Sequence, residues 1–198
     1  MLQRPTDRNI FQNAWVVDDY KASCKKWINE LGIGPFYVGD YEIDVDYRGE
    51  RQQLKMSIAI AQAGQVQIEL IQPNVDVCVY RDSVAKGSDG FHHMCVWTHD
   101  IAADTEYFQS LGYPVATQGK VGDIEFAYYD TRPLMGYMLE VATPSESLLT
   151  QSNRIKEAAV NWDGKDSAVR SRSQEKKIKK SGPEQKNKYH QHSLPFGL

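Results

Sequence analysis

The residues best suited to chemistry are two glutamates that interrupt apolar, strand-like runs in separate parts of the 198-residue chain. Glu69 lies within the run QIELI at 67–71, and Glu140 lies within MLEVA at 138–142. Because side chains alternate between the two faces of a strand, each carboxylate is expected opposite its apolar neighbours. Burying an unpartnered carboxylate is costly, so each should meet a cation, a metal ion or hydrogen-bond donors. The alternative for either glutamate alone is an edge-strand position that faces water.

The elements that carry these glutamates occur twice in the same order. The first set is a strand at 9–17, a helix at 20–31 and strands at 36–46, 53–63 and 65–72. The second set is a strand at 90–98, a helix at 101–111 and strands at 114–118, 124–131 and 136–142. An internal repeat of this kind constrains the fold more strongly than any single motif. The sequence therefore predicts an α+β fold in which two βαβββ modules, 9–73 and 90–145, form a curved, mostly antiparallel sheet around a cavity.

The junctions between the first strand and the helix support this repeat. Asp18 and Asp19 end the first opening strand and can cap the helix that follows, and His99 and Asp100 end the second opening strand at the matching positions. Gly32 and Gly112 stand where the two helices should end. A last helix is expected within the region 146–165, packed on the outside of the sheet.

Composition limits the classes of protein to which the chain can belong. It is 41% hydrophobic and 25% charged, which suits a globular protein of one domain or two small modules. No apolar run approaches the roughly 18–20 residues that span a bilayer, and the first residues do not resemble a signal peptide. The chain has three cysteines, and none of them lies in a C-x-x-C pair. This cysteine usage predicts reduced thiols and a cytoplasmic protein.

Charge is distributed unevenly along the chain. Between positions 170 and 188 there are eight Lys or Arg against two acids, whereas the rest carries 15 bases and 24 acids. The segment 171–198 has no hydrophobic period and is predicted to be a disordered basic tail. The acidic body does not favour nucleic acid or an anionic membrane as a partner.

The repeat places four polar residues at equivalent positions. Gln12 on the first opening strand corresponds to His93 on the second, and Glu69 corresponds to Glu140 on the closing strands. A pseudo-twofold axis would bring all four to one centre, where imidazole, carboxylate and amide oxygen form a plausible ligand set for a divalent ion. The alternatives are a satisfied core histidine for His93 and an ordinary pocket residue for Gln12. His92 is expected on the opposite face of its strand.

At these residues the sequence resembles the vicinal oxygen chelate superfamily, which includes glyoxalase I, methylmalonyl-CoA epimerase, extradiol dioxygenases and bleomycin or fosfomycin resistance proteins. The resemblance spans about residues 9–165 and points to an epimerase-like glyoxalase subgroup. The motifs that carry it are GFHHMCVWTHDI from Gly90, QIELIQP from Gln67 and YYDTRPLMGYMLEV from Tyr128.

The resemblance implies a metal site formed by one residue from each opening strand and one from each closing strand. Carried over by position, the ligands are Gln12, Glu69, His93 and Glu140, and the ion is Mn, Co, Ni, Zn or Mg. Metal-binding members usually have a histidine where this chain has Gln12, and an amide oxygen binds more weakly than imidazole. Non-haem Fe(II) dioxygenases need two histidines and one carboxylate, so dioxygenase activity is disfavoured.

The function that the resemblance implies is a metal-assisted isomerase, epimerase or lyase that abstracts a proton next to a carbonyl of a small substrate. A divalent ion would stabilise the developing oxyanion, and Glu140 or Glu69 would move the proton. The alternatives are a metal-free, ligand-sequestering protein of the resistance type and a metal-free acid/base enzyme on the same fold. A homodimer is also expected from the resemblance.

Several other polar residues are weaker candidates for substrate contacts. Arg48, Arg51 and Arg132 could each meet a substrate carboxylate or phosphate, with a solvated surface position as the ordinary alternative. One alternating set of side chains among Tyr128, Tyr129 and the following aspartate could face the cavity.

Overall fold

A computed structural model describes residues 8–171 of the chain. In chain order its elements are β1 (Ile10–Val16), α1 (Tyr20–Leu31), β2 (Phe36–Tyr47), β3 (Glu50–Ala63), β4 (Val66–Pro73), a short 3-10 helix η2 (Val79–Asp82), β5 (Gly90–Trp97), α2 (Ile101–Ser110), β6 (Val115–Val121), β7 (Ile124–Tyr129), α3 (Arg132–Met135), β8 (Met138–Ala142), α4 (Glu146–Val160) and β9 (Val169–Ser171). The predicted strand–helix–strand–strand–strand order therefore occurs twice.

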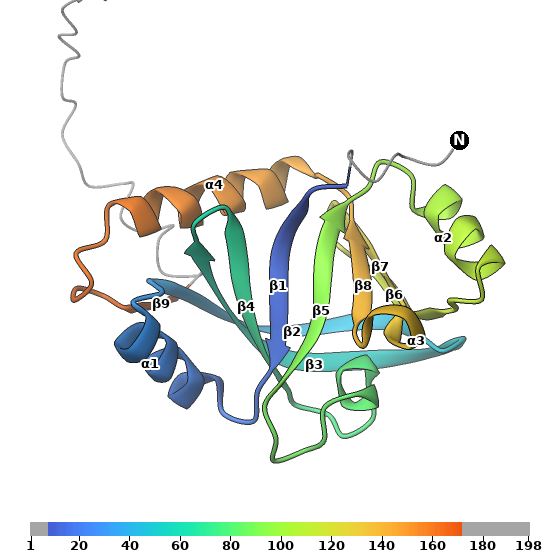
Figure 1. The fold of residues 1–198 in the computed structure, drawn as a ribbon, viewed down its shortest axis with the longest axis horizontal. Coiled ribbons are helices and arrows are strands. Elements are labelled where there is room, and N and C mark those ends of the chain that lie inside the picture. The colour runs from blue at the N-terminus through green and yellow to red at the C-terminus, as the bar shows by residue number, and fades with distance from the viewer. Residues whose placement is uncertain (1–7, 172–198) are drawn as a thin grey trace, which may run out of the picture.

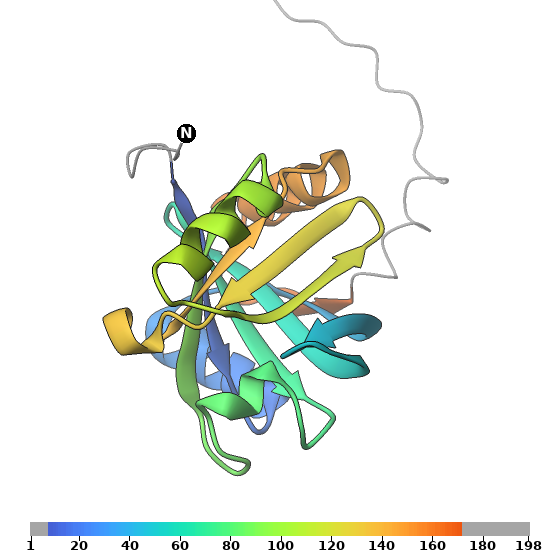
Figure 2. The ribbon, with the colours of Figure 1, turned by 90° about the vertical axis from the view of Figure 1, so that its right-hand side faces the viewer.

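The strands form one sheet in the order β3-β4-β1-β5-β8-β7-β6-β2-β9, and β2 also pairs with β3. The opening strands β1 and β5 pair antiparallel along one seam between the modules. The strands β2 and β6 pair antiparallel along a second seam, at 45–47 and 117–119. These two seams close the sheet into a barrel, and Figure 2 shows its strands curving round on themselves. The predicted α+β fold with a curved, mostly antiparallel sheet is confirmed.

The two module helices begin as the sequence predicts. The Asp19 carboxylate accepts hydrogen bonds from the backbone N–H groups of Lys21 and Ala22 at the start of α1. The Asp100 carboxylate accepts one from Ala103 at the start of α2. Gly32 ends α1 with a φ of 66°, a left-handed conformation that costs glycine little.

Apolar side chains form three clusters that correspond to the layers of the fold. One fills the space between the sheet and α1, and another lies between the sheet and α2. The largest cluster lines the inside of the barrel. Figure 1 shows α1 and α2 on opposite sides of the molecule, where they cover the outer faces of their own modules. The inner face of the sheet therefore remains for a cavity.

The last helix lies elsewhere than the sequence analysis predicts. We expected it to pack on the outside of the sheet, but α4 crosses one end of the barrel (Figure 1). Ile155 is 2% exposed and belongs to the inner apolar cluster. Leu148 and Ala158 pack against the same cluster. These positions recur on one face of the helix, and that face must bury its apolar stripe against the barrel opening.

A network of ion pairs joins the two modules at one rim of the barrel. The guanidinium of Arg48, in the β2–β3 turn, contacts Asp82 at 2.6 Å and Asp130 at 3.1 Å. Arg132 donates two hydrogen bonds to the Asp130 carboxylate, at 2.7 and 2.6 Å, and one to the Asp82 carbonyl at 2.6 Å. The Arg132 hydrogen bonds, with those of Arg48, lower the pKa of Asp130 to about 2. We refer to Arg48, Asp82, Asp130 and Arg132 as the rim network.

Other expectations concern the ends of the chain and the thiols. The predicted basic tail, 171–198, lies outside the described residues except for Ser171, which ends β9. The three cysteines are free and buried, as predicted for reduced thiols. Within residues 8–171, no helix has the length and apolar character needed to cross a membrane.

Candidate functional site

The four predicted site residues lie on four neighbouring strands in the order β4, β1, β5 and β8. Ala14 of β1 is the register partner of both Glu69 and His93, so these two side chains flank it. Cys95 of β5 in the same way lies between Gln12 and Glu140. The small side chains of the two middle residues leave room for the flanking groups to approach each other.

The structure brings His93, Glu69 and Glu140 into one buried cluster. The Nε2 atom of His93 lies 3.0 Å from Oε2 of Glu140 and 3.7 Å from Oε2 of Glu69. His93 is completely buried, and the two glutamates are 9% exposed or less. Although the Glu140 oxygen is close, it lacks the alignment of a hydrogen bond, and Nε2 has no hydrogen-bond partner among the described residues. The imidazole nitrogen therefore lies beside two carboxylates without a hydrogen bond to either.

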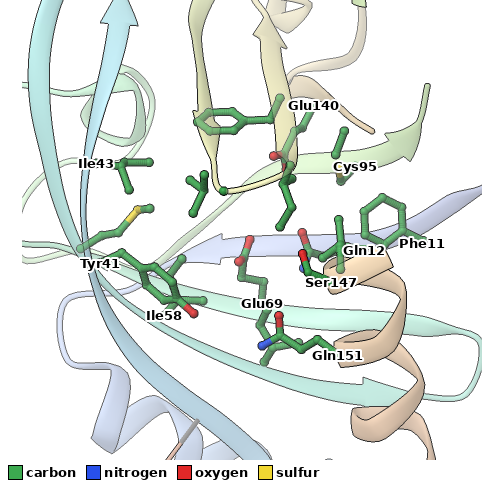
Figure 3. Close-up of a pocket in the computed structure, with 18 of the residues that line it drawn as sticks. Phe11, Gln12, Tyr41, Ile43, Ile58, Glu69, Cys95, Glu140, Ser147 and Gln151 are labelled. Atoms are coloured by element: carbon green, nitrogen blue, oxygen red, sulfur yellow. The ribbon is translucent and has the colours of Figure 1, made fainter. Parts of the chain in front are cut away.

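Gln12 belongs to the same site but is held differently. Its amide nitrogen donates a long hydrogen bond of 3.4 Å to the side-chain oxygen of Gln67 on β4. That bond leaves the amide oxygen of Gln12 for another partner. Figure 3 shows Gln12, Glu69 and Glu140 directed toward a common space.

The electrostatics of the cluster are unfavourable for its carboxylates. No Lys or Arg of the described chain forms an ion pair with Glu69 or Glu140. Burial, followed by the negative charge of Glu140, raises the pKa of Glu69 well above its usual value. A cluster of this kind favours a bound cation or a shared proton.

His92 is an exception to the alternation predicted for β5. The register of β1 with β5 passes from Ala14 opposite His93 to Trp15 opposite Phe91, so His92 forms a β-bulge. A bulge adds a residue and turns two successive side chains toward the same side. Consequently the Nδ1 atoms of His92 and His93 lie 3.0 Å apart, and the prediction that His92 faces away is wrong.

The contacts of His92 determine where His93 carries its proton. The Nε2 of His92 lies 3.1 Å from the carbonyl of Val79, which can only accept, so Nε2 is the donor. Burial lowers the pKa of His92 to about 3, which leaves the ring neutral and its Nδ1 an acceptor. His93 must then donate from its own Nδ1 to His92. The remaining nitrogen of His93, Nε2, faces the two glutamates and is available for a metal ion or a second proton.

Two buried tyrosines complete the inner wall of the site. The Tyr128 ring lies edge-on to His93 at 4.8 Å, and burial and nearby carboxylates raise the Tyr128 pKa well above its usual value. Tyr80, in η2, has its pKa raised mainly by burial and donates its hydroxyl hydrogen to the sulfur of Met56. Both rings are neutral hydrogen-bonding groups at neutral pH. Sequence analysis missed Tyr80 because it lies in an irregular connection between the modules.

A cavity of about 450 Å³ opens from this cluster toward α4. Its volume falls within the range of small-molecule sites. Ser147 and Gln151 of α4 also line the cavity (Figure 3). The rest of the lining is mainly apolar and comes largely from β2, β3 and β7.

The comparison with known families settles the relationship of this chain. A family model described as the glyoxalase/bleomycin resistance protein/dioxygenase superfamily matches residues 11–128, which is more than half of the chain. The chain belongs to this superfamily. Its match includes Gln12, Glu69 and His93, whereas Glu140 lies beyond the matched residues. The search of curated proteins found no match.

Several solved structures share the fold of this chain. The methylmalonyl-CoA epimerase from Mycobacterium tuberculosis matches with a TM-score of 0.51 and 14% identity, covering 76% of this chain and 97% of that one. A methylmalonyl-CoA epimerase in complex with methylmalonyl-CoA and NH4+ matches with a TM-score of 0.51 and 17% identity, covering 70% and 95%. A Streptomyces coelicolor methylmalonyl-CoA epimerase variant in complex with 2-nitronate-propionyl-CoA matches with a TM-score of 0.51 and 16% identity. The match covers 70% of this chain and 95% of that one.

The donor chemistry of the cluster fits the divalent ion that the superfamily resemblance implies. Imidazole nitrogen and carboxylate oxygen are common ligands for such ions. Nε2 of His93 and Oε2 of Glu140 lie 3.0 Å apart, and these two residues would hold the ion. Within residues 8–171, no group of three His, Cys, Asp or Glu side chains is placed to hold a metal ion. Glu69 or Gln12 would add a further oxygen ligand.

The weaker candidates of the sequence analysis fall in different places. Tyr128 lines the cavity, whereas Tyr129 faces α2 on the outside of the sheet. Arg48 and Arg132 belong to the rim network, and Arg51 forms an exposed pair with Asp44. None of these three arginines is part of the cavity wall of the described chain.

Proposed function

We propose that this protein is an isomerase, epimerase or lyase that removes a proton next to a carbonyl group of a small organic substrate. The observation that carries the proposal is the buried cluster of Glu69, Glu140 and His93, which opens on a cavity and has no Lys or Arg partner in the described chain. Unpaired buried carboxylates of this kind are costly to the fold and are typical of sites with a chemical role. The fold shared with epimerases agrees with this reaction class.

We assign different roles to the two glutamates. Glu140 lies nearest the unpartnered nitrogen of His93, so these two residues would hold a divalent ion, with Gln12 as a weaker ligand. Glu69 is further from that nitrogen, and its raised pKa makes it the better proton acceptor. When bound, a divalent ion supplies Lewis-acid stabilisation of the oxyanion that forms as the proton leaves.

The chain's own residues account for the other steps of the proposal. Glu69 is 7% exposed, so its carboxylate would meet the substrate in a medium of low dielectric constant. Tyr80 and Tyr128 remain protonated on the inner wall. Tyr80 donates its hydroxyl hydrogen to the sulfur of Met56, so Tyr128 is the one of the two that would donate a hydrogen bond to the substrate. Return of the proton from Glu69 to another atom of the enolate gives isomerisation, and protonation of the opposite face by a second acid gives epimerisation. Loss of a β-substituent gives a lyase reaction.

A metal-free binding protein is the second candidate. The mainly apolar lining of the cavity favours it, because hydrophobic enclosure alone can retain a ligand. A dioxygenase remains disfavoured, although His92 and His93 are neighbours. Both ring nitrogens of His92 already have partners, the Val79 carbonyl and His93 Nδ1, so His92 does not provide the second histidine ligand.

The test of the proposal combines metal content with proton exchange. Protein purified without a His tag is dialysed against metal-free buffer, offered Mn, Co, Ni or Zn, and analysed for bound metal beside the double variant His93→Ala/Glu140→Ala. We expect one equivalent in the wild type and none in the double variant. Exchange of α-protons for deuterium is then followed by NMR over a panel of 2-oxo and 2-hydroxy carbonyl compounds. Absence of both metal and exchange in the wild type would contradict the proposal and leave the binding protein.

A further inference from the structure

The cavity that serves the proposed reaction has an unusual charge distribution. Twenty-one described residues line it, and none is Lys, Arg or His. Its charged groups are all acidic, namely Glu69 and Glu140 at the inner end and Asp123 near α4. The remaining polar side chains are few, and most of the wall is aliphatic or aromatic.

The arginines nearest to the site are not available to a ligand inside the cavity. Arg48 and Arg132 are held by Asp82 and Asp130 in the rim network, at distances between 2.6 and 3.1 Å. Arg154 lines an adjacent hollow, which shares Asp123, Ser147 and Gln151 with the cavity but lies outside the cavity wall itself. The wall of the cavity therefore offers no cationic side chain of the described chain to an anionic group.

The body of the ligand would lie between two apolar surfaces. Ile43 and Ile58 contribute one wall from the hairpin of β2 and β3, and Phe126 contributes from β7. Leu148 of α4 closes the opposite side, and Phe11 extends the wall beside Gln12. Transfer of an ionised group from water to such surroundings is strongly unfavourable, whereas transfer of hydrocarbon is favourable.

We infer that the substrate is an uncharged, mainly hydrophobic carbonyl compound, whose carbonyl end reaches Glu69 and Glu140 and whose hydrocarbon body packs between the β2–β3 wall and α4. The inference rests on the proposed function for the position of the carbonyl group. It differs from the CoA thioesters named for two of the similar structures, because those ligands carry several anionic groups. The charge of the cavity, rather than the shared fold, therefore selects the substrate class.

Three ketones that differ only at the distal end test this inference. They are the 6-methyl, 6-carboxylate and 6-aminomethyl derivatives of 2-acetylnaphthalene, which share the acetyl group and the ring system. Their dissociation constants are measured by calorimetry at pH 7.5, with and without Mn²⁺. We expect the methyl compound to bind at least about tenfold more tightly than either charged compound, because the apolar walls provide no counter-ion for a group that loses hydration. Asp123, the acidic group near α4, is exposed to solvent and already accepts hydrogen bonds from Ser147.

Other outcomes would overturn the inference. Equal or tighter binding of the carboxylate would show that an anion finds a cation in the cavity, and equal or tighter binding of the ammonium compound would indicate a site for cations. Failure of all three to bind would also overturn it. The dissociation constants are measured without turnover and also in the Glu69→Gln variant, which lacks the proposed base. A failure of this inference is therefore distinct from a failure of the proton-exchange test.

A charge added to the wall provides a further check. Ile43 is half-buried on β2, and its replacement by lysine, Ile43→Lys, places an ammonium group beside the cavity. We expect this variant to bind the 6-carboxylate compound at least about tenfold more tightly than the wild type. The matched control is Glu42→Gln, which adds the same charge at the exposed neighbouring position and should leave that affinity unchanged. Equal affinities in Ile43→Lys and the wild type would argue against the proposed placement of the ligand.

Discussion

The cluster inside the barrel and the rim network contain the same functional group in opposite surroundings. At the rim, Asp130 accepts two hydrogen bonds from Arg132 and one from Arg48, and its pKa falls to about 2. Inside, Glu69 is more deeply buried, has no Lys or Arg partner in the described chain, and its pKa rises. The rim carboxylates join two modules, whereas the inner carboxylates remain uncompensated until a ligand or proton arrives.

The difference teaches how to separate a structural acid from a functional one in this fold. A carboxylate with a bidentate arginine contributes stability and offers little to a substrate. A carboxylate buried beside a second one lowers stability and keeps a high affinity for protons and cations.

The largest effect should come from removing the proposed base. We expect Glu69→Gln to lower α-proton exchange by at least about 100-fold, since that is the usual contribution of a positioned general base. Bound metal should remain, because His93 and Glu140 are intact. The matched rim variant, Asp130→Asn, should change the exchange rate by less than about twofold, since it is outside the cavity. Similar losses in both variants would contradict the separation of the two regions.

The next effect concerns the stability of the rim. Arg132→Ala removes two hydrogen bonds to Asp130 and one to the Asp82 carbonyl, and should lower the free energy of unfolding by about 2 kcal/mol. Metal content should not change. Arg51→Ala breaks only an exposed pair with Asp44 and serves as the control, with an expected change below about 0.5 kcal/mol. Urea unfolding measures the loss of stability in both variants. Equal losses would show that the ion pairs of the rim network are as weak as the exposed pair of Arg51 and Asp44.

A third effect tests how His92 orients the cluster. Its substitution by leucine, His92→Leu, removes the acceptor for the Nδ1 proton of His93 and should weaken metal binding by about tenfold, the usual loss when a residue that orients a ligand is removed. His92→Gln retains a donor and an acceptor and should recover part of the loss. Nitrogen-15 NMR of the zinc-loaded or metal-free wild type should show the His93 proton on Nδ1. A proton on Nε2 alone would refute this account of the tautomer.

Most of the fold was predictable from the sequence, because the repeat of strand and helix patterns is a property of each module by itself. The cap at Asp19 is local and was predicted for the same reason. The meeting of His93, Glu69 and Glu140 also followed from the repeat, since equivalent positions converge about a pseudo-twofold axis.

Other features depend on long-range contacts or on single-residue irregularities. The bulge at His92 changes the strand period at one residue and leaves no trace in the hydrophobic pattern. The rim network joins Arg48, Asp82 and Asp130 from three connections far apart in sequence. The position of α4 was missed because its apolar stripe fits an outer face of a sheet as well as the end of a barrel.

A smaller effect should appear in acid. The folded-state pKa of Asp130 is about 2, below the value of about 3.9 for an unfolded aspartate. Its contribution to stability is therefore complete above about pH 4 and is lost as the pH falls toward 2. We expect a loss of about 1 kcal/mol over this range after screening by solvent. Asp130→Asn should show a flatter acid dependence than the wild type, and an unchanged slope would contradict the assignment.

Urea unfolding of metal-free Glu69→Gln and Asp130→Asn at pH 7.5 tests the comparison most directly. Replacing a buried, uncompensated carboxylate by a neutral amide should raise the free energy of unfolding by about 1 kcal/mol, whereas the rim substitution should lower it by about the same amount. Opposite signs are the predicted result. A loss of stability in both variants would show that Glu69 has a stabilising partner, and would contradict the claim that the inner carboxylates are kept for a ligand.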